Sequence, residues 1–259
     1  MALELTKTER SELMNCLLDM GQLLLNCGAE VSRVEDTLSR MSKAYGCIRV
    51  EVFVITSIIS LSMEFKDEEV LTETKRIYSS SGTDFVRLED LNSISRSCCT
   101  QPIPVSELKK RLERVSTEEK PFTAILLGSI LAAASFAVFF GGTLWDGVIA
   151  GAFAVAICLL QIRLGNTQIT QVGANLMISF LVGLGVGLLC LFIPGIHMDK
   201  ILIGDIMLLI PGLAMTNSIR NMLGGNTISG LIRLTESLIW AGALAGGFMT
   251  AFMIIDFVL

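Results

Sequence analysis

The feature that most constrains this fold is the near absence of charge from the second half of the chain. Residues 1–120 hold 16 of the 20 Lys and Arg and 20 of the 25 Asp and Glu, so only four basic and five acidic side chains remain for residues 121–259. A bilayer core about 30 Å thick needs about 20 apolar residues of helix to cross it. The long apolar runs at 122–142, 147–162, 172–193, 201–219 and 235–257 therefore predict five transmembrane helices.

Charge and composition exclude several classes of function. A net charge of −5 leaves no basic surface for nucleic acid. The seven cysteines are odd in number and contain no CxxC pair, so neither a disulfide framework nor a zinc site is indicated. His197 is the only histidine and lies in the apolar half, which argues against a nucleophile–base pair in the polar half. We therefore expect no enzyme, no metal site and no cofactor.

Residues 1–118 are predicted to form a small α+β domain, and residues 119–259 an all-α polytopic membrane domain. Apolar side chains recur at helical spacing over 8–27, 31–45, 88–98 and 105–115, and they alternate with polar ones over 48–52 and 59–65. A hairpin turn at 66–69 leads into a third strand at about 70–78. Two helices, a three-stranded meander and two more helices follow from these periods. Gly28 suits the end of the first helix. The second helix carries the densest polar cluster, which includes Glu30, Arg33 and Glu35 and is either a solvated face or a ligand-contacting, gating surface.

The positive-inside rule predicts how the chain is oriented in the bilayer. With the first domain in the cytosol, eight Lys and Arg lie on the inner side (109, 110, 111, 114, 120, 163, 220 and 233) and only Lys200 lies outside. No cleavable signal peptide is indicated at the start of the chain. Five spans then place the C-terminus outside. Pairs of glycines four residues apart in the spans suit close helix packing within the chain, or in a homo-oligomer or a two-subunit assembly.

The fourth predicted span is interrupted. Pro211 removes a backbone donor and Gly212 tolerates unusual dihedral angles, so we expect the helix to be broken there. Broken helices in transporters expose helix ends to substrate. The candidate residues for substrate binding or gating are Asp205, Pro211, Gly212, Thr216, Asn217, Arg220 and Glu236. Asp205 and Glu236 are also compatible with side chains at the membrane boundary, and Arg220 with a topology anchor on the inner face.

The chain resembles the threonine/serine exporter family of bacterial inner-membrane proteins. The resemblance rests on the stretches 24–30, 33–37 and 45–46 in the polar half and 209–212, 216–220 and 229–231 in the apolar half. It implies a cytosolic domain followed by about five membrane helices, and export of small polar metabolites. Because single-chain members carry further membrane helices, it also implies a split exporter whose smaller membrane subunit is encoded separately. Relatives often place acidic residues near Asn221 and Asn226, which leaves proton coupling through that loop in doubt.

The leading hypothesis is therefore a component of a secondary exporter for threonine or serine in the bacterial cytoplasmic membrane. Export of succinate or another dicarboxylate is the first alternative. A membrane-anchored ligand sensor, in which the first domain does the work, is the second, and a passive channel is a further possibility. No Walker motif is present, which disfavours ATP-driven transport by this chain. The expected partners are a small-molecule substrate, a second membrane subunit and the lipid bilayer.

Overall fold

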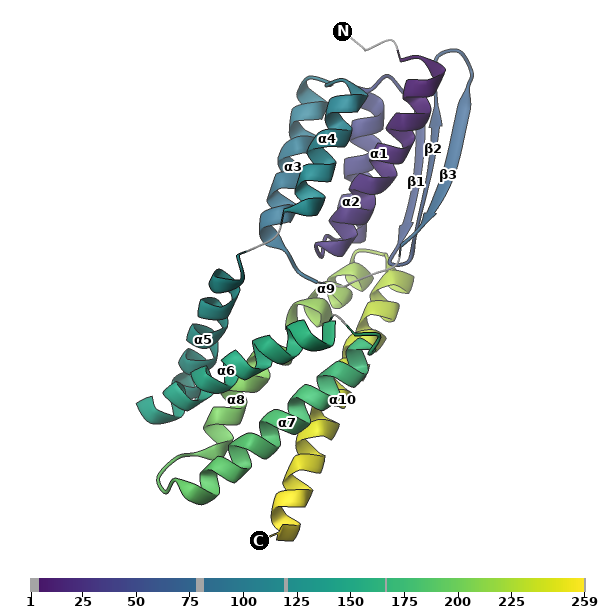
Figure 1. The fold of residues 1–259 in the computed structure, drawn as a ribbon. Coiled ribbons are helices and arrows are strands. Elements are labelled where there is room, and N and C mark those ends of the chain that lie inside the picture. The colour runs from purple at the N-terminus through teal and green to yellow at the C-terminus, as the bar shows by residue number, and fades with distance from the viewer. Residues whose placement is uncertain (1–4, 78–81, 119–120, 166, 259) are drawn as a thin grey trace. The chain divides into compact units, whose positions relative to one another are not determined.

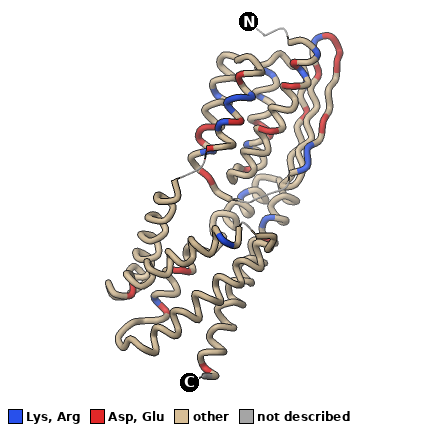
Figure 2. Tube along the Cα trace, viewed as in Figure 1, with Lys and Arg blue, Asp and Glu red and all other residues tan. Residues whose placement is uncertain are grey.

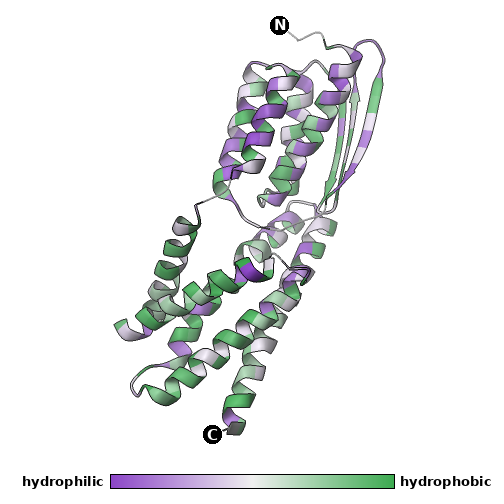
Figure 3. Cartoon of the chain, in the orientation of Figure 1, coloured by the Kyte–Doolittle hydropathy of each residue, from purple (hydrophilic) through white to green (hydrophobic). Residues whose placement is uncertain are grey.

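The computed structural model describes residues 5–77, 82–118, 121–165 and 167–258 (Figure 1). The chain forms two compact units, and each unit combines two separate segments of the sequence. The first unit comprises residues 1–118 with 213–234, and the second comprises residues 119–212 with 235–259. Lys, Arg, Asp and Glu concentrate in the first unit (Figure 2), and apolar residues dominate the helices of the second (Figure 3).

The first unit contains helices on a small antiparallel sheet. Its elements are α1 (Lys7–Asn26), α2 (Val31–Ala44), β1 (Arg49–Ile55), β2 (Ile58–Glu64), β3 (Val70–Arg76), α3 (Phe85–Thr100), α4 (Val105–Thr117), most of α9 (Gly212–Leu223) and the first residues of α10 (Thr227–Val258). The two strands expected from alternation and the third expected after the hairpin turn are present, and residue 78 lies outside the described residues. The sheet order is β1-β2-β3, and the central strand buries Ile59, Leu61 and Met63 against the helices.

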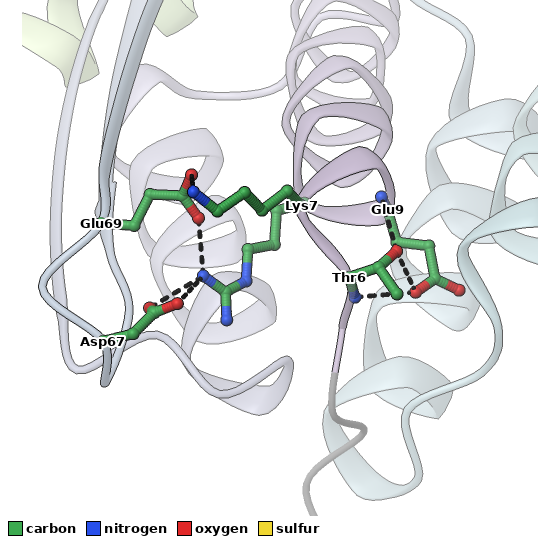
Figure 4. Close-up of polar contacts among 6 residues, drawn as sticks. Thr6, Lys7, Glu9, Asp67 and Glu69 are labelled. Carbon is green, nitrogen blue, oxygen red and sulfur yellow. Dashed lines mark hydrogen bonds and ion pairs between the residues drawn. The ribbon is translucent and has the colours of Figure 1, made fainter.

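The start of α1 is tied to the β2–β3 hairpin. Thr6 and Glu9 form a reciprocal capping box at the helix N-terminus (Figure 4). One turn on, Nη1 of Arg10 lies 2.7 Å from Oδ2 of Asp67 and 2.6 Å from Oε2 of Glu69, both on the hairpin. Hydrogen bonding to Arg10 lowers the pKa of Asp67 below its usual range. These contacts hold the β2–β3 hairpin against the start of α1, although the two segments are far apart in the sequence.

The second unit is a cluster of apolar helices. It consists of α5 (Phe122–Phe139), α6 (Leu144–Gly165), α7 (Gln171–Phe192), α8 (Met198–Leu209) and the rest of α10. Four helices among the described residues (α5, α6, α7 and α10) are long and apolar enough to cross a membrane. The pair α8 and α9 passes the same test together as one bent span. Length and composition thus give four or five spans, in agreement with the five expected.

Glycines allow close packing within the second unit. A Cβ added at Gly147 would lie 2.9 Å from Val138 on α5, and one added at Gly187 would clash with Ile255 on α10. These contacts show that two of the predicted glycine pairs serve packing inside the chain. Around Gly242 and Gly246, by contrast, a Cβ would meet no described heavy atom within 4 Å.

The fourth predicted span is broken at the expected proline. α8 ends at Leu209, Ile210 is extended, and α9 begins after Pro211. The proline ring disfavours helical dihedral angles at the residue before it, which accounts for the extended conformation of Ile210. α9 continues to Leu223, past residue 219, where the span was expected to end.

The last helix begins earlier than hydropathy suggests. α10 starts at Thr227, whereas the apolar run starts at 235. The turn before it has Gly225 at φ 91°, and the amides of Gly225 and Asn226 donate to the carbonyls of Met222 and Asn221, so α9 ends in a Schellman motif. Residues 227–234, which mix Ile and Leu with Thr227, Ser229 and Arg233, therefore belong to the helix although they precede the expected span.

Candidate functional site

A cavity of about 200 Å³ lies in the first unit where four helices meet. α1 and its terminal turn, the start of α2, the start of α3 and the helix α9 all contribute to its wall. The lining residues are Leu24, Gly28, Ala29, Glu30, Arg33, Thr37, Phe85, Leu88, Asn92, Asn217 and Arg220. The cavity therefore joins residues from both predicted motif regions, which lie about 190 positions apart in the sequence.

The turn between α1 and α2 lines the cavity with Gly28 and Ala29. Gly28 has φ 88°, a left-handed conformation that a residue with a Cβ rarely adopts. The amides of Gly28 and Ala29 donate to the carbonyls of Leu25 and Leu24, which is the Schellman pattern that ends α1. A Cβ at Gly28 would also lie 3.4 Å from the carbonyl oxygen of Gly82. Glycine thus permits the sharp reversal that brings the start of α2 beside the end of α1.

Glu30 and Arg220 form an ion pair at the cavity wall. Nη1 of Arg220 lies 2.7 Å from Oε1 of Glu30. Glu30 is the N-cap residue of α2, but its side chain makes no capping hydrogen bond, so its carboxylate is directed to the arginine. The Glu30 side chain is 23% exposed and that of Arg220 is 63% exposed. The pair is therefore within reach of solutes in water.

Two further polar side chains stand beside this pair. Asn217 lies one helical turn before Arg220 on α9 and also lines the cavity. Arg33 lies on the first turn of α2, is exposed, and forms no ion pair within the described part of the chain. With two arginines and one glutamate, the charged residues of the lining have a net charge of +1. Such a surface attracts an anionic group while keeping one carboxylate available for a cation.

Glu35 has a different place from the other residues of its cluster. Its Oε1 accepts a hydrogen bond of 3.0 Å from the backbone amide of Val54 on the edge strand β1. Val54 is buried, and the carboxylate satisfies a donor that the sheet leaves without a partner on that edge. Glu35 therefore joins α2 to the sheet and does not line the cavity.

The remaining candidates from the sequence do not line this cavity. Asp205 lies on α8 in the second unit and is fully buried. Pro211 and Gly212 form the break before α9, and Thr216 is exposed on α9. Glu236 is exposed on α10. The sequence did not single out Phe85, Leu88 and Asn92 as cavity residues, because one apolar stripe and an isolated amide carry no ligand signal.

A second polar cluster, also missed in the sequence, lies in the second unit. The fully buried carboxylate of Asp146 accepts hydrogen bonds from the amide and hydroxyl of Thr143, at 2.7 and 2.9 Å. It also accepts from the amide of His197 at 2.8 Å, and Nδ1 of that histidine lies 2.9 Å away. Thr143 and Asp146 thus form a reciprocal capping box at the start of α6, and Asp146 also fixes the residue that precedes α8. A single acidic residue at the start of an apolar run gave no sign of this role.

Comparison with known proteins gives one family over most of the chain. The ThrE family model, whose description is "Putative threonine/serine exporter", matches residues 15–255. A protein of Klebsiella aerogenes named "Probable succinate transporter subunit YjjP" is 25% identical over 231 residues, which cover 88% of each chain. The protein of the same name from Escherichia coli K12 is 23% identical over 230 residues, again 88% of each chain.

A longer relative matches only in part. The threonine/serine exporter of Corynebacterium glutamicum is 23% identical over 243 residues, which cover 90% of this chain but 49% of that protein. No solved structure matches the chain significantly.

Proposed function

The chain belongs to the threonine/serine exporter family and is a membrane transporter, not an enzyme, and on that basis we propose that it exports a small zwitterionic amino acid such as threonine or serine. The observation that carries the proposal is the cavity beside Glu30 and Arg220.

The charges of the cavity match those of a free amino acid. Such a substrate carries a carboxylate and an ammonium on one carbon atom. Arg33 or Arg220 suits the carboxylate, and Glu30 suits the ammonium. The amide of Asn217 adds a donor and an acceptor for a hydroxyl side chain. At about 200 Å³ the cavity is smaller than the roughly 300–1,000 Å³ typical of pockets for drug-sized molecules, which favours a solute of a few heavy atoms.

The ion pair between Glu30 and Arg220 can also be exchanged for contacts with the substrate when the cavity is filled. Without substrate, Glu30 and Arg220 neutralise each other at 2.7 Å. A zwitterion that enters between them replaces one intramolecular pair by two intermolecular ones, so neither charge is left unpaired. The exposure of Arg220 keeps the cost of separating the pair low.

We place the first unit in the cytosol and the C-terminus outside. The support is the excess of eight Lys and Arg over one in the segments that flank the spans. In this orientation the cavity meets cytosolic substrate, as export requires. Two relatives that match over 88% of each chain are named as transporter subunits, which supports a second membrane subunit as a partner of this chain.

Succinate is the second candidate substrate. It is favoured by the two relatives named as succinate transporter subunits, which match over 88% of their length. Its two carboxylates suit Arg33 and Arg220 together, but Glu30 then repels them. The carboxylate of Glu30 is thus the group that distinguishes the two candidates.

Uptake into inverted membrane vesicles tests the proposal directly. Vesicles that contain the chain and its second subunit are given labelled threonine, serine or succinate. We expect accumulation of threonine or serine that Arg220→Ala reduces. Arg49→Ala is the matched control, because Arg49 pairs with Glu51 at the surface of β1 and does not line the cavity.

The other outcomes decide between the alternatives. Accumulation of succinate alone would replace the amino acid by the dicarboxylate. Accumulation of none of the three would remove the exporter assignment for these substrates. A ligand sensor would bind its ligand without transporting it, and Arg220→Ala would not alter any flux.

A further inference from the structure

Asp205 is a carboxyl group inside an apolar helix cluster of the second unit. The buried face of α8 consists of Ile201, Leu202, Gly204, Asp205 and Leu209. The positions four residues before and after Asp205, which share its face, are both occupied by buried apolar side chains. Asp205 is 0% exposed, and neither of its carboxyl oxygens has a hydrogen-bond partner among the described residues.

The helices packed against α8 bring little charge to this carboxyl group. α8 packs on α5, α6 and α7. α5 and α7 contain no Asp, Glu, Lys, Arg or His. The charged residues of α6 are Asp146 in its first turn and Arg163 in its last turn, and Asp146 is bonded to Thr143 and His197.

The other titratable residues nearby do not pair with Asp205 either. The thiols of these packed helices are Cys158 on α6 and Cys190 on α7. On α8 itself, Asp199 and Lys200 pair with each other at 2.9 Å. Within the described residues no cation is therefore bonded to Asp205.

The packing around Asp205 is tight. A Cβ added at the preceding residue, Gly204, would lie 2.5 Å from the carbonyl oxygen of Ala133 on α5. An ionised carboxylate in such a place has lost its hydration and gained no partner, which is a costly state, whereas the neutral acid is tolerated. The backbone ladder of α8 also ends four residues later, before Pro211, so α8 is a short segment of its own.

We propose that Asp205 is a proton-binding site: its carboxyl group holds a proton in the conformation described, and it releases the proton when α8 moves away from α5 and water reaches the group. A proton bound and released in this way couples the cycle of the transporter to the proton gradient. The inference rests on the burial and packing of α8, and it is independent of which substrate occupies the cavity of the first unit.

Infrared spectroscopy of the purified full-length chain in lipid nanodiscs tests the bound proton without any transported substrate. At neutral pH we expect a carbonyl band of a protonated carboxyl group that shifts in heavy water and is lost in Asp205→Asn. Asp199→Asn is the matched control on the same helix, because Asp199 is exposed and paired with Lys200, and it leaves the band in place. The absence of a difference between wild type and Asp205→Asn, with both proteins folded, would overturn the proposal.

A transport assay then tests the coupling. In vesicles with the second subunit, Asp205→Asn should lower the accumulation driven by a pH gradient at least tenfold and should retain exchange of labelled for unlabelled substrate. Unchanged gradient-driven accumulation would overturn the proposal, as would a wild-type protein driven by sodium and indifferent to pH. Loss of exchange at normal membrane abundance would also overturn it, since the carboxyl group would then serve the transport cycle itself. Failure of wild type to transport any tested substrate refutes the proposed function, and the infrared result still decides the proton site.

Discussion

Removing the guanidinium of Arg220 should impair transport far more than it impairs folding. The ion pair with Glu30 is a single contact of 2.7 Å, and its arginine side chain is 63% exposed. Exposed ion pairs contribute about 0.2–1 kcal/mol to stability, and solvent screening places this one at the low end. Arg220→Ala should therefore remain folded and reach the membrane at normal abundance.

The loss for the substrate is larger. A hydrogen bond to a charged group contributes about 1.5–3 kcal/mol, and each 1.4 kcal/mol is a factor of ten. If Arg220 binds the substrate carboxylate, Arg220→Ala should raise the apparent KM for export roughly 10- to 100-fold. The assay is the initial rate of labelled threonine uptake into inverted vesicles over a range of concentrations, with the abundance of each variant measured by immunoblot.

A charge exchange separates substrate binding from the ion pair itself. The double variant Glu30→Arg with Arg220→Glu keeps an opposite pair but inverts its direction. It should recover the stability of the wild type and fail to recover the KM. An unchanged KM in Arg220→Ala, or full transport by the exchanged pair, would refute the proposal that the cavity binds a zwitterion in one fixed orientation.

Three further predictions concern packing, structure and pH. Gly247→Ala places a Cβ against the hydroxyl oxygen of Ser179 on α7 and should lower the free energy of unfolding by about 1–3 kcal/mol, measured by thermal denaturation. The adjacent Gly246→Ala, whose Cβ meets no described atom within 4 Å beyond the backbone of its own helix, should change little. Glu35→Ala leaves the buried amide of Val54 without its acceptor and should lower the free energy of unfolding by about 1–3 kcal/mol, measured by denaturant unfolding. The substrate KM should be unchanged once abundance is corrected, and a raised KM would contradict the structural role. The pKa of Asp67 is lowered in the folded state, so its contribution to stability is present above about pH 3.9, the usual pKa in the unfolded chain, and is lost as the pH falls through the folded pKa. The difference in thermal midpoint between wild type and Asp67→Asn should therefore vanish on acidification. A difference that persists at low pH would refute this role of Asp67.

The candidate membrane helices could be predicted from the sequence because an uncharged apolar run of about 18 or more residues is typical of a transmembrane helix. Their ends do not follow as well. Hydropathy marks the depth of the bilayer, whereas a helix ends where its backbone is capped. α10 therefore begins at Thr227, eight residues before the apolar run, and α9 ends at the left-handed Gly225 turn.

The residues of the candidate site were recognisable, but their arrangement was not. Glu30, Arg33, Asn217 and Arg220 each stand out as polar groups in a helical context. Nothing in the sequence reveals that Arg220 meets Glu30, because no local spacing relates residues 190 positions apart. The cluster around Glu30 also divides in the structure, since Glu35 points to the backbone of β1.

Asp205 shows a similar limit. Hydropathy places it about one turn from the expected membrane boundary, where a side chain can reach water. The burial of α8 against α5, α6 and α7 decides otherwise, and burial by tertiary packing is not encoded in a linear hydropathy profile.

The most direct test of the central claim is the ratio of threonine uptake to succinate uptake in the same inverted vesicles, measured for wild type and for Glu30→Gln. We predict that wild type prefers threonine and that Glu30→Gln, which removes the charge that pairs with an ammonium and repels a second carboxylate, lowers the ratio about tenfold or more. A ratio that is the same in both proteins would contradict the assignment of the cavity as the substrate site.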